Sequence, residues 1–185
     1  MNGLDELYKD RCRRASDINQ HLPTLKKYAA ECDHVTEMGV RGGDSTRALA
    51  AARPKTLICY DIVNCNVNEV CELATQNDVD FIFKKQDVIE SGFVIDNTDL
   101  LFIDTMHNYN QLRTELSMHG DRVLKYIILH DTTTFGERDE FPNVNPDSLK
   151  RGLVPAVDEF ISENEPWKVL KEFTNNNGLT ILTRV

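Results

Sequence analysis

Residues 37–46 read Glu37-Met38-Gly39-Val40-Arg41-Gly42-Gly43-Asp44-Ser45-Thr46. Residues 34–38 have the short apolar character of a buried strand, and residues 44–52 have the spacing of a helix that Pro54 stops. The three glycines between them allow a tight turn and let a ligand approach the backbone without Cβ atoms in the way. Ser45 and Thr46 are expected to open the helix. The stretch predicts a strand–turn–helix unit. Because it lacks the G-x-G-x-x-G spacing, two interpretations stay open: the unit holds a nucleotide-like ligand, or it is a plain turn.

The alternation of short apolar runs with longer amphipathic segments continues on the C-terminal side of this unit. Such alternation is typical of a parallel sheet covered by helices. We expect further strands at residues 56–60, 80–84, 100–103 and 126–129, and helices at residues 66–76 and 109–124. Asn108 and Gln111 resemble a capping pair at the start of the second of these helices. On the N-terminal side, residues 4–30 have helical spacing that Pro23 divides into two helices.

The last third of the chain adds two features to the parallel pattern. Residues 132–150 show little periodicity, and a loop of this length in a compact domain is usually a lid or a binding loop. Beyond Pro155, which can start a helix at its first position, two apolar runs at residues 167–173 and 179–183 flank an Asn-Gly turn. The sequence therefore predicts one α/β domain over residues 1–185, with N-terminal helices at residues 1–31 and a sheet that ends in an antiparallel hairpin.

Composition narrows the classes of function. The 185 residues include 21 basic and 30 acidic ones, a formal net charge of -9, so the surface should repel phosphate backbones and anionic membranes. Neither nucleic acid nor a membrane is expected as a partner. Five cysteines without a C-x-x-C pair favour a reduced, cytoplasmic protein. The N-terminus lacks the apolar core of a signal peptide, and the chain lacks an apolar run long enough to span a bilayer.

Acidic residues stand at or beside the ends of five successive predicted strands. They are Glu37, Asp61, Asp87, Asp104 and Asp131. Because ligands of an open parallel sheet bind beyond the carboxyl ends of its strands, we expect these residues to line one crevice. The crevice suits a ligand with several donors or a positive charge. Asp61 stands where an acidic side chain accepts both hydroxyls of an adenosine ribose, which NAD and S-adenosylmethionine both carry.

Three stretches resemble motifs of class I S-adenosylmethionine-dependent methyltransferases. Residues 37–46 look like the first motif of that superfamily. Residues 100–109 (LLFIDTMHNY) and 127–132 (IILHDT) resemble its fourth and fifth strand ends, as in macrocin-type sugar O-methyltransferases and cephalosporin-hydroxylase-like members. The resemblance covers the chain from about Asp33 to the C-terminus. It implies a Rossmann-like three-layer sandwich around a seven-stranded, mostly parallel sheet with an antiparallel C-terminal hairpin.

The resemblance also implies roles for individual residues. The implied cofactor-binding residues are Glu37, Gly39, Arg41, Gly43, Ser45, Thr46, Asp61, Gln86, Asp87 and Asp104. In this assignment the glycine turn holds the amino acid part of S-adenosylmethionine, Asp61 the ribose, and residues 86–88 border the adenine. Asp104, facing the sulfonium, and His107, as general base, are the implied catalytic residues. Asp104 and Asp131, with His130 beside them, would bind a divalent cation such as Mg²⁺ or Mn²⁺.

Two departures from the pattern bear on the metal. His130 stands where related enzymes often place a second carboxylate, and Thr132 stands where catechol-type enzymes place an amide. Because neutral imidazole is a poor Mg²⁺ ligand, the site could hold a softer ion, use fewer protein ligands, or hold none. Without an ion, Asp104 would accept from the cofactor ammonium, and Asp131 and His130 would bond to loop backbone or substrate. The remaining histidines, His21, His34 and His119, are assigned to surface or packing roles.

The leading interpretation is an O-methyltransferase for a small polyhydroxylated acceptor, such as a sugar or other glycan, with residues 132–150 and the N-terminal helices closing over it. Phe135, Arg138 and Phe141 in this loop suit a ring-shaped ligand. A dimer is compatible with the sequence, which does not fix the oligomeric state. One alternative is an NAD-dependent oxidoreductase, opposed by the missing second glycine of the dinucleotide motif and by the terminal hairpin. The other is a binding protein that kept the fold and lost turnover.

Overall fold

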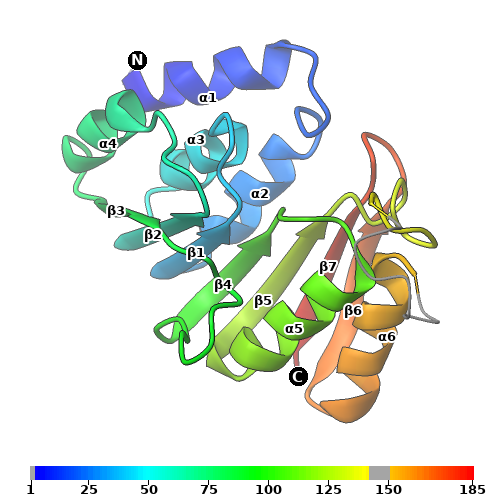
Figure 1. Cartoon of the computed structure of the whole chain (residues 1–185). Helices are drawn as coiled ribbons and strands as arrows, with labels where there is room; N and C mark the ends of the chain where they lie inside the picture. Colours follow the sequence, from blue (N-terminus) through cyan, green and yellow to red (C-terminus); the bar gives the residue numbers. More distant parts are fainter. Residues whose placement is uncertain (1–2, 142–150) are drawn as a thin grey trace.

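A seven-stranded sheet forms the centre of the molecule in the computed structural model, which describes residues 3–141 and 151–185 (Figure 1). The strand order is β3-β2-β1-β4-β5-β7-β6. The strands span His34–Met38 (β1), Thr56–Asp61 (β2), Asp80–Lys85 (β3), Thr98–Ile103 (β4), Val123–His130 (β5), Trp167–Phe173 (β6) and Leu179–Arg184 (β7). Neighbouring strands are parallel except where β7 pairs with β5 and β6. The predicted antiparallel hairpin, formed by the last two strands of the chain, is confirmed.

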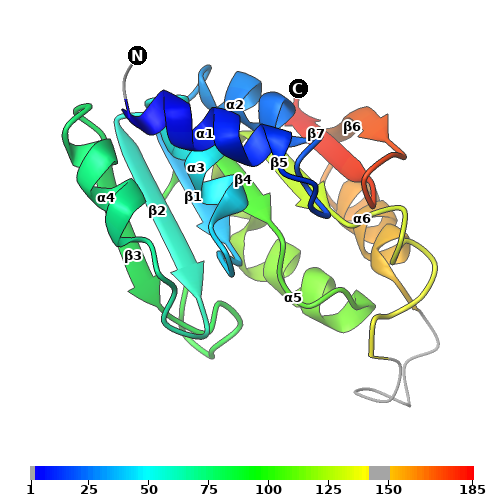
Figure 2. The ribbon, with the colours of Figure 1, turned by 90° about the horizontal axis from the view of Figure 1, so that it is seen from above.

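Helices cover both faces of this sheet. One face carries α1 (Gly3–Arg13), α2 (Leu22–Ala29), α3 (Asp44–Ala51) and α4 (Asn68–Thr75), and the other carries α5 (Tyr109–His119) and α6 (Leu153–Glu163). Seen from above, α1 lies over α3, against which it packs (Figure 2). The arrangement is the Rossmann-like three-layer sandwich that the sequence predicts.

Strand β4 illustrates how the two cores are filled. Leu100 and Phe102 belong to the core beneath α1–α4, whereas Leu101 and Ile103 belong to the core beneath α5 and α6. All four side chains are buried. Because successive side chains of a strand point to opposite faces, a sheet covered on both sides requires such a continuous apolar run.

The strand register brings the carboxyl ends of β1, β2, β4 and β5 to one place. Met38 pairs with Tyr60 of β2 and with Ile103 of β4, and Ile103 pairs in turn with Leu129 of β5. The residues that follow these four in the chain are Gly39, Asp61, Asp104 and His130. The crevice expected from the sequence therefore forms where these strands end.

The prediction of a helix at residues 109–124 was wrong at the C-terminal end of the helix. Its start is confirmed, since Asn108 Oδ1 accepts from the Gln111 amide at 2.8 Å. However, α5 ends at His119, residues 120–122 form a 3₁₀ turn, and β5 already begins at Val123. A Cβ at Gly120 would lie 2.5 Å from a ring carbon of Phe160 in α6. This close packing of α6 onto the backbone, together with the pairing of Val123 with β4, overrides the helical spacing.

The break between the two N-terminal helices also differs from the prediction. It lies between Arg13 and Leu22, so Pro23 stands in the first turn of α2 instead of dividing the helices. Pro155 likewise stands in the first turn of α6, which begins at Leu153. The structure describes residues 132–141 of the predicted lid loop, and residues 142–150 lie outside the described residues. Among the described helices, none is long and apolar enough to cross a membrane.

Candidate active site

Gly39 lies where the ends of β1 and β4 approach each other in the crevice. Its φ is +86°, and a Cβ at this position would lie 2.0 Å from the carbonyl oxygen of Asp104. The Gly39 amide donates to the carbonyl of Tyr60, and the Asp104 amide donates to that of Met38, each at 2.9 Å. A positive φ without room for a side chain requires glycine. The turn thereby lets the ends of β1 and β4 meet.

Helix α3 begins at Asp44, as the sequence predicts, and Ser45 and Thr46 lie in its first turn. No side chain caps the helix, and Gly43, with a φ of +72°, precedes it. Thr46 Oγ1 instead donates to Glu37 Oε2 at 2.7 Å. The buried Arg47 reaches back and donates through Nη1 to the carbonyls that end the turn, those of residues 42 and 43, at 2.8 and 2.6 Å. Side chains of α3 therefore hold the turn from behind.

Glu37 lies fully buried beneath the turn. Its Oε2 accepts from Thr46, whereas its Oε1 is buried without a hydrogen-bond partner. Burial raises the pKa of Glu37 to about 7, although the neighbouring Ser45, Cys59 and Thr46 side chains counteract this in part. Glu37 thus supports the turn from below, as a carboxyl group that holds its proton more tightly than one in water.

Asp61, at the end of β2, fastens the turn from the other side. Its Oδ2 accepts from the amides of Val40 and Arg41 at 2.9 and 3.0 Å, and its Oδ1 accepts from the Val63 amide at 3.0 Å. Burial opposes ionisation, but these backbone hydrogen bonds outweigh it and lower the pKa of Asp61. A carboxylate has about four acceptor positions, so Asp61 can still accept from a ligand.

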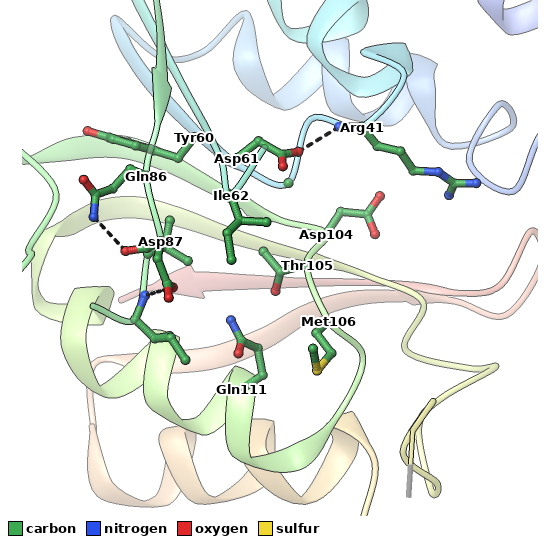
Figure 3. Close-up of a pocket in the computed structure, with 13 residues that line it drawn as sticks. Arg41, Tyr60, Asp61, Ile62, Gln86, Asp87, Asp104, Thr105, Met106 and Gln111 are labelled. Atoms are coloured by element: carbon green, nitrogen blue, oxygen red, sulfur yellow. Dashed lines mark hydrogen bonds between the residues drawn. The ribbon is translucent and has the colours of Figure 1, made fainter. Parts of the chain in front are cut away.

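A cavity of about 400 Å³ opens between the glycine turn, the end of β2, residues 86–89, the end of β4 and the start of α5 (Figure 3). Its volume lies in the usual range for a pocket that binds a small molecule. Apolar and polar groups share its wall: Tyr60, Ile62, Val88, Ile89 and Met106 on the apolar side, and Arg41, Asp61, Gln86, Asp87, Asp104, Thr105 and Gln111 on the polar side. Such a wall suits a ligand with one flat apolar part and several hydroxyl or amino groups.

Internal hydrogen bonds fix the outer wall of this cavity. Gln86 Nε2 donates to the Asp87 carbonyl at 2.9 Å, and Asp87 Oδ1 accepts from the amide of Ile89 at 3.1 Å. The buried His119 at the end of α5 donates through Nε2 to the carbonyl of Val88 at 2.8 Å. Burial lowers the pKa of His119, which favours this neutral donor. Residues 86–89, which form this wall, are therefore held in place before any ligand binds.

A cluster of acidic and imidazole groups lies at the β4–β5 side of the cavity. His107 Nε2 lies 3.2 Å from Asp104 Oδ1 and 2.9 Å from Asp131 Oδ2. His130 Nδ1 lies 3.3 and 3.2 Å from the same two oxygens. Asp131 has a φ of +61°, and its Oδ1 is buried without a partner. The structure thus brings together all the residues assigned to catalysis and metal binding.

Opposite charges shift the pKa values within this cluster in opposite directions. Burial alone would lower the pKa of His107 and of His130, but their hydrogen bonds to Asp104 and Asp131 outweigh it and raise each pKa to about 10. The same hydrogen bonds lower the pKa of Asp104 and of Asp131 against the effect of burial. The two imidazoles, when protonated, neutralise the two carboxylates.

His130 connects the cluster with distant parts of the chain. Its Nε2 lies 3.1 Å from the carbonyl of Asp17, ahead of α2, and 3.3 Å from that of Asn176, in the turn of the hairpin. His21 lies beside it, with the ring centroids 5.8 Å apart, and its Nε2 lies 2.9 Å from the carbonyl of Asn175. The segment between α1 and α2 is thereby fixed against the hairpin at the border of the crevice.

A second cavity, of about 330 Å³, lies on the other side of the glycine turn. Its wall is formed by Arg11, Ser16, Asp17, Ile18, Val40, Arg41, Gly42, Asp44, Ser45 and Asp104. Arg41 and Asp104 line both cavities. The guanidinium of Arg41 lies 2.9 Å from Asp17 Oδ2, so the side chain points to the second cavity's rim. The two cavities therefore adjoin at the turn and at Asp104.

Most of the implied cofactor residues thus line one of these cavities. Gly39, Arg41, Asp61, Gln86, Asp87 and Asp104 line the first, and Ser45 lines the second. Glu37, Gly43 and Thr46 instead shape the turn behind them.

The residues that the sequence did not indicate include a group of polar residues near the crevice: Thr105, Gln111, Glu115 and Glu140. Thr105 and Gln111 line the first cavity, and both donate to Oε1 of the buried Glu115, at 2.7 and 2.8 Å. Burial raises the pKa of Glu115 to about 7. The spacing of Gln111 and Glu115, one helical turn apart, was a usable signal. Glu140, whose Oε2 lies 2.9 Å from His107 Nδ1, gave no such signal.

The cluster has the donor set of a metal site. The ligand atoms of Asp104, His107 and Asp131 all lie within 4.8 Å of one another, and they form the candidate metal-binding group found among residues 3–141 and 151–185. His130, which the sequence assigned to the metal, lies beside this group. Two carboxylates and one imidazole suit divalent ions of the first transition row. The unpartnered Oδ1 of Asp131 fits a role in such a site as well.

Comparison with solved structures finds methyltransferases with a similar fold. An O-methyltransferase from Bacillus cereus in complex with SAH matches with a TM-score of 0.64 and 15% identity, over 98% of this chain and 90% of that one. The O-methyltransferase TomG of tomaymycin synthesis, from Streptomyces achromogenes with SAM bound, matches with a TM-score of 0.59 and 15% identity, over 100% and 90%. The N-methyltransferase NodS from Bradyrhizobium japonicum WM9 in complex with S-adenosyl-L-homocysteine matches with 0.59 and 11%, over 100% and 99%.

The chain therefore shares the form of the Rossmann-like fold that these methyltransferases have. Protein-family models and curated proteins give no match.

Proposed function

We propose that this chain is a methyltransferase that uses S-adenosylmethionine as the methyl donor. The observation that carries the proposal is the pair of adjoining cavities at the carboxyl ends of β1, β2 and β4, with Asp104 in the wall of both. The methyl donor has two polar ends joined at a positively charged sulfur. A divided site with a carboxylate at the junction suits such a molecule, because the carboxylate attracts the sulfonium.

The first cavity is assigned to the adenosine half of the donor. Ile62 and Val88 offer apolar surface to the adenine, and Asp61 can accept from the ribose hydroxyls. The second cavity is assigned to the amino acid half. Arg41 and the N-terminus of α3 lie at its wall, where a carboxylate finds positive charge and free amides. The methyl group would then lie at the junction, beside Asp104.

We further propose a hydroxyl group of a small polyhydroxylated molecule, such as a sugar, as the methyl acceptor. A hollow of about 590 Å³ is lined by Thr132, Thr133, Thr134, Gly136, Glu137, Arg138 and Val154. Most of these residues come shortly after Asp131 of the cluster in the sequence. The hydroxyl and charged groups of the hollow suit a ligand rich in hydroxyls. Transfer to oxygen requires alignment of the acceptor with the methyl and loss of the acceptor's proton.

The cluster would supply this activation. Asp104, His107 and Asp131 would hold a divalent cation, which would supply a Lewis acid that lowers the pKa of the acceptor hydroxyl. The geometry counts against His107 as a free general base. Its Nε2 faces two carboxylates and its Nδ1 faces Glu140, so any proton it holds is shared with these groups and is not readily exchanged with an acceptor.

Titration calorimetry with S-adenosylhomocysteine tests the donor site. Wild-type protein is expected to bind it, and Asp61→Ala is expected to bind it roughly ten to a hundred times more weakly, because charge-assisted hydrogen bonds to the ribose are lost. Asp158→Ala, an exposed change on α6, serves as the matched control. Absence of binding to wild-type protein at millimolar ligand would overturn the proposal, and heat on adding NADH instead would favour the oxidoreductase alternative.

A transfer assay tests the acceptor. S-adenosylhomocysteine release is followed with sugars, catechols and primary amines at equal concentration. We expect turnover with the sugars. Turnover with the amines alone would place the chain among N-methyltransferases and refute the proposed acceptor class.

A further inference from the structure

The segment that follows β5 contacts the His107 ring on one edge and one face and also binds the His107 backbone. Glu140 Oε2 lies 2.9 Å from its Nδ1, and the Glu140 amide donates to the His107 carbonyl at 2.8 Å. Phe135 stacks on the ring with centroids 4.9 Å apart and the planes 2° from parallel. Asp139 Oδ1 fixes the segment by accepting from the amides of Tyr109 and of residue 152, at 2.9 and 2.7 Å. The ring can therefore neither flip nor tilt freely.

This clamp determines which nitrogen of His107 faces the cluster. A carboxylate only accepts, so Glu140 places a proton on Nδ1. Nε2 then points at Asp104 Oδ1 and Asp131 Oδ2, at 3.2 and 2.9 Å. An imidazole nitrogen with its lone pair toward two carboxylate oxygens needs a cation between them, either a second proton or a metal ion.

One unpartnered atom favours a metal ion over a second proton, and the distances are compatible with both. Ligand atoms around a divalent ion with bonds of about 2.1 Å lie about 3.0 to 3.4 Å apart at octahedral or tetrahedral angles, which includes the 3.2 Å contact with Asp104 and nearly the 2.9 Å contact with Asp131. A proton on Nε2 would leave Asp131 Oδ1 buried and unpaired, as it is in the structure. A metal ion could take both Asp131 oxygens or bind a water that donates to Oδ1.

We propose that His107 is a metal ligand through Nε2, that Glu140 is the positioning residue that orients it, and that the site prefers a transition-metal dication to Mg²⁺. The inference deepens the proposed function but does not require that the donor binds. A carboxylate behind a ligating histidine fixes the tautomer and raises the basicity of the ligand nitrogen. Imidazole suits ions such as Co²⁺, Ni²⁺ and Zn²⁺, whereas Mg²⁺ prefers oxygen ligands.

Binding of Co²⁺, without donor or acceptor, tests the proposal. Wild-type protein is expected to bind Co²⁺ at least tenfold more tightly than Mg²⁺ in titration calorimetry and to give a visible absorption band from the bound ion. Glu140→Gln is expected to weaken Co²⁺ binding roughly tenfold and Glu140→Ala up to a hundredfold, because both lose the charge behind His107. His107→Gln is expected to abolish the Co²⁺ preference.

The matched control is Glu165→Gln, an exposed change between α6 and β6 that removes the same charge. Circular dichroism establishes that each variant is folded. Equal affinity of wild-type protein for Co²⁺ and Mg²⁺, wild-type Co²⁺ affinity in His107→Gln, or full rescue by Glu140→Gln would overturn the inference. Binding of S-adenosylhomocysteine is measured separately, so failure of the donor site and failure of the metal site give different results.

Discussion

Replacing Gly39 by alanine is expected to lower the free energy of unfolding by about 2 to 5 kcal/mol, from the cost of a left-handed backbone and of overpacking. The added Cβ would lie 2.0 Å from the Asp104 carbonyl oxygen and 2.6 Å from its carbon, and both are backbone atoms that a side chain's rotation cannot move. The ends of β1 and β4 would have to separate. Since a domain is usually stable by only about 5 to 15 kcal/mol, urea denaturation should resolve the change easily.

Gly42 provides the control within the same turn. A Cβ at Gly42 would have nothing within 4 Å, so Gly42→Ala is expected to change the stability by less than about 0.5 kcal/mol. Equal denaturation midpoints for the two variants would show that β1 and β4 do not meet as described.

Replacing Glu37 by glutamine is expected to change the pH dependence of stability. Burial raises the pKa of Glu37 from 4.5 to about 7, so the folded protein keeps a proton that the unfolded chain releases. The stability that this proton confers is fully present below pH 4.5 and is lost as the pH rises through about 7. The loss amounts to about 3 kcal/mol at most, and Glu37→Gln should remove it.

The measurement is the urea midpoint of both proteins between pH 5 and pH 8. The variant is expected to gain stability over wild type progressively across this range. The slope should not vanish, because burial also raises the pKa of Glu115 to about 7 and this group loses its stabilising proton over the same interval. Glu72→Gln, an exposed change on α4, controls for the lost charge. Parallel curves for wild type and Glu37→Gln would contradict the buried, poorly paired environment of Glu37.

The strands were predictable because their signal is local. The central parallel strands are largely buried on both faces, so most of their residues are apolar, and β1 was predicted with both ends correct. Element ends were predicted less well where tertiary contact decides them, as at Gly120, where the ring of Phe160 stops α5. Ser45 and Thr46 lie in the first turn of α3 as predicted, but the sequence did not show that the Thr46 hydroxyl donates to the buried Glu37 carboxyl group.

By itself, the sequence determined which residues stand at the ends of the strands. In a parallel sheet those ends lie together, so the positions of Asp61, Asp104 and Asp131 in the chain sufficed to predict one crevice. Only the tertiary structure decided how the side chains in that crevice pair. Glu140 meets His107 across 33 positions, and His130 meets the carbonyl of Asp17 across 113. No periodicity encodes contacts between loops so far apart, because packing of the whole chain sets them.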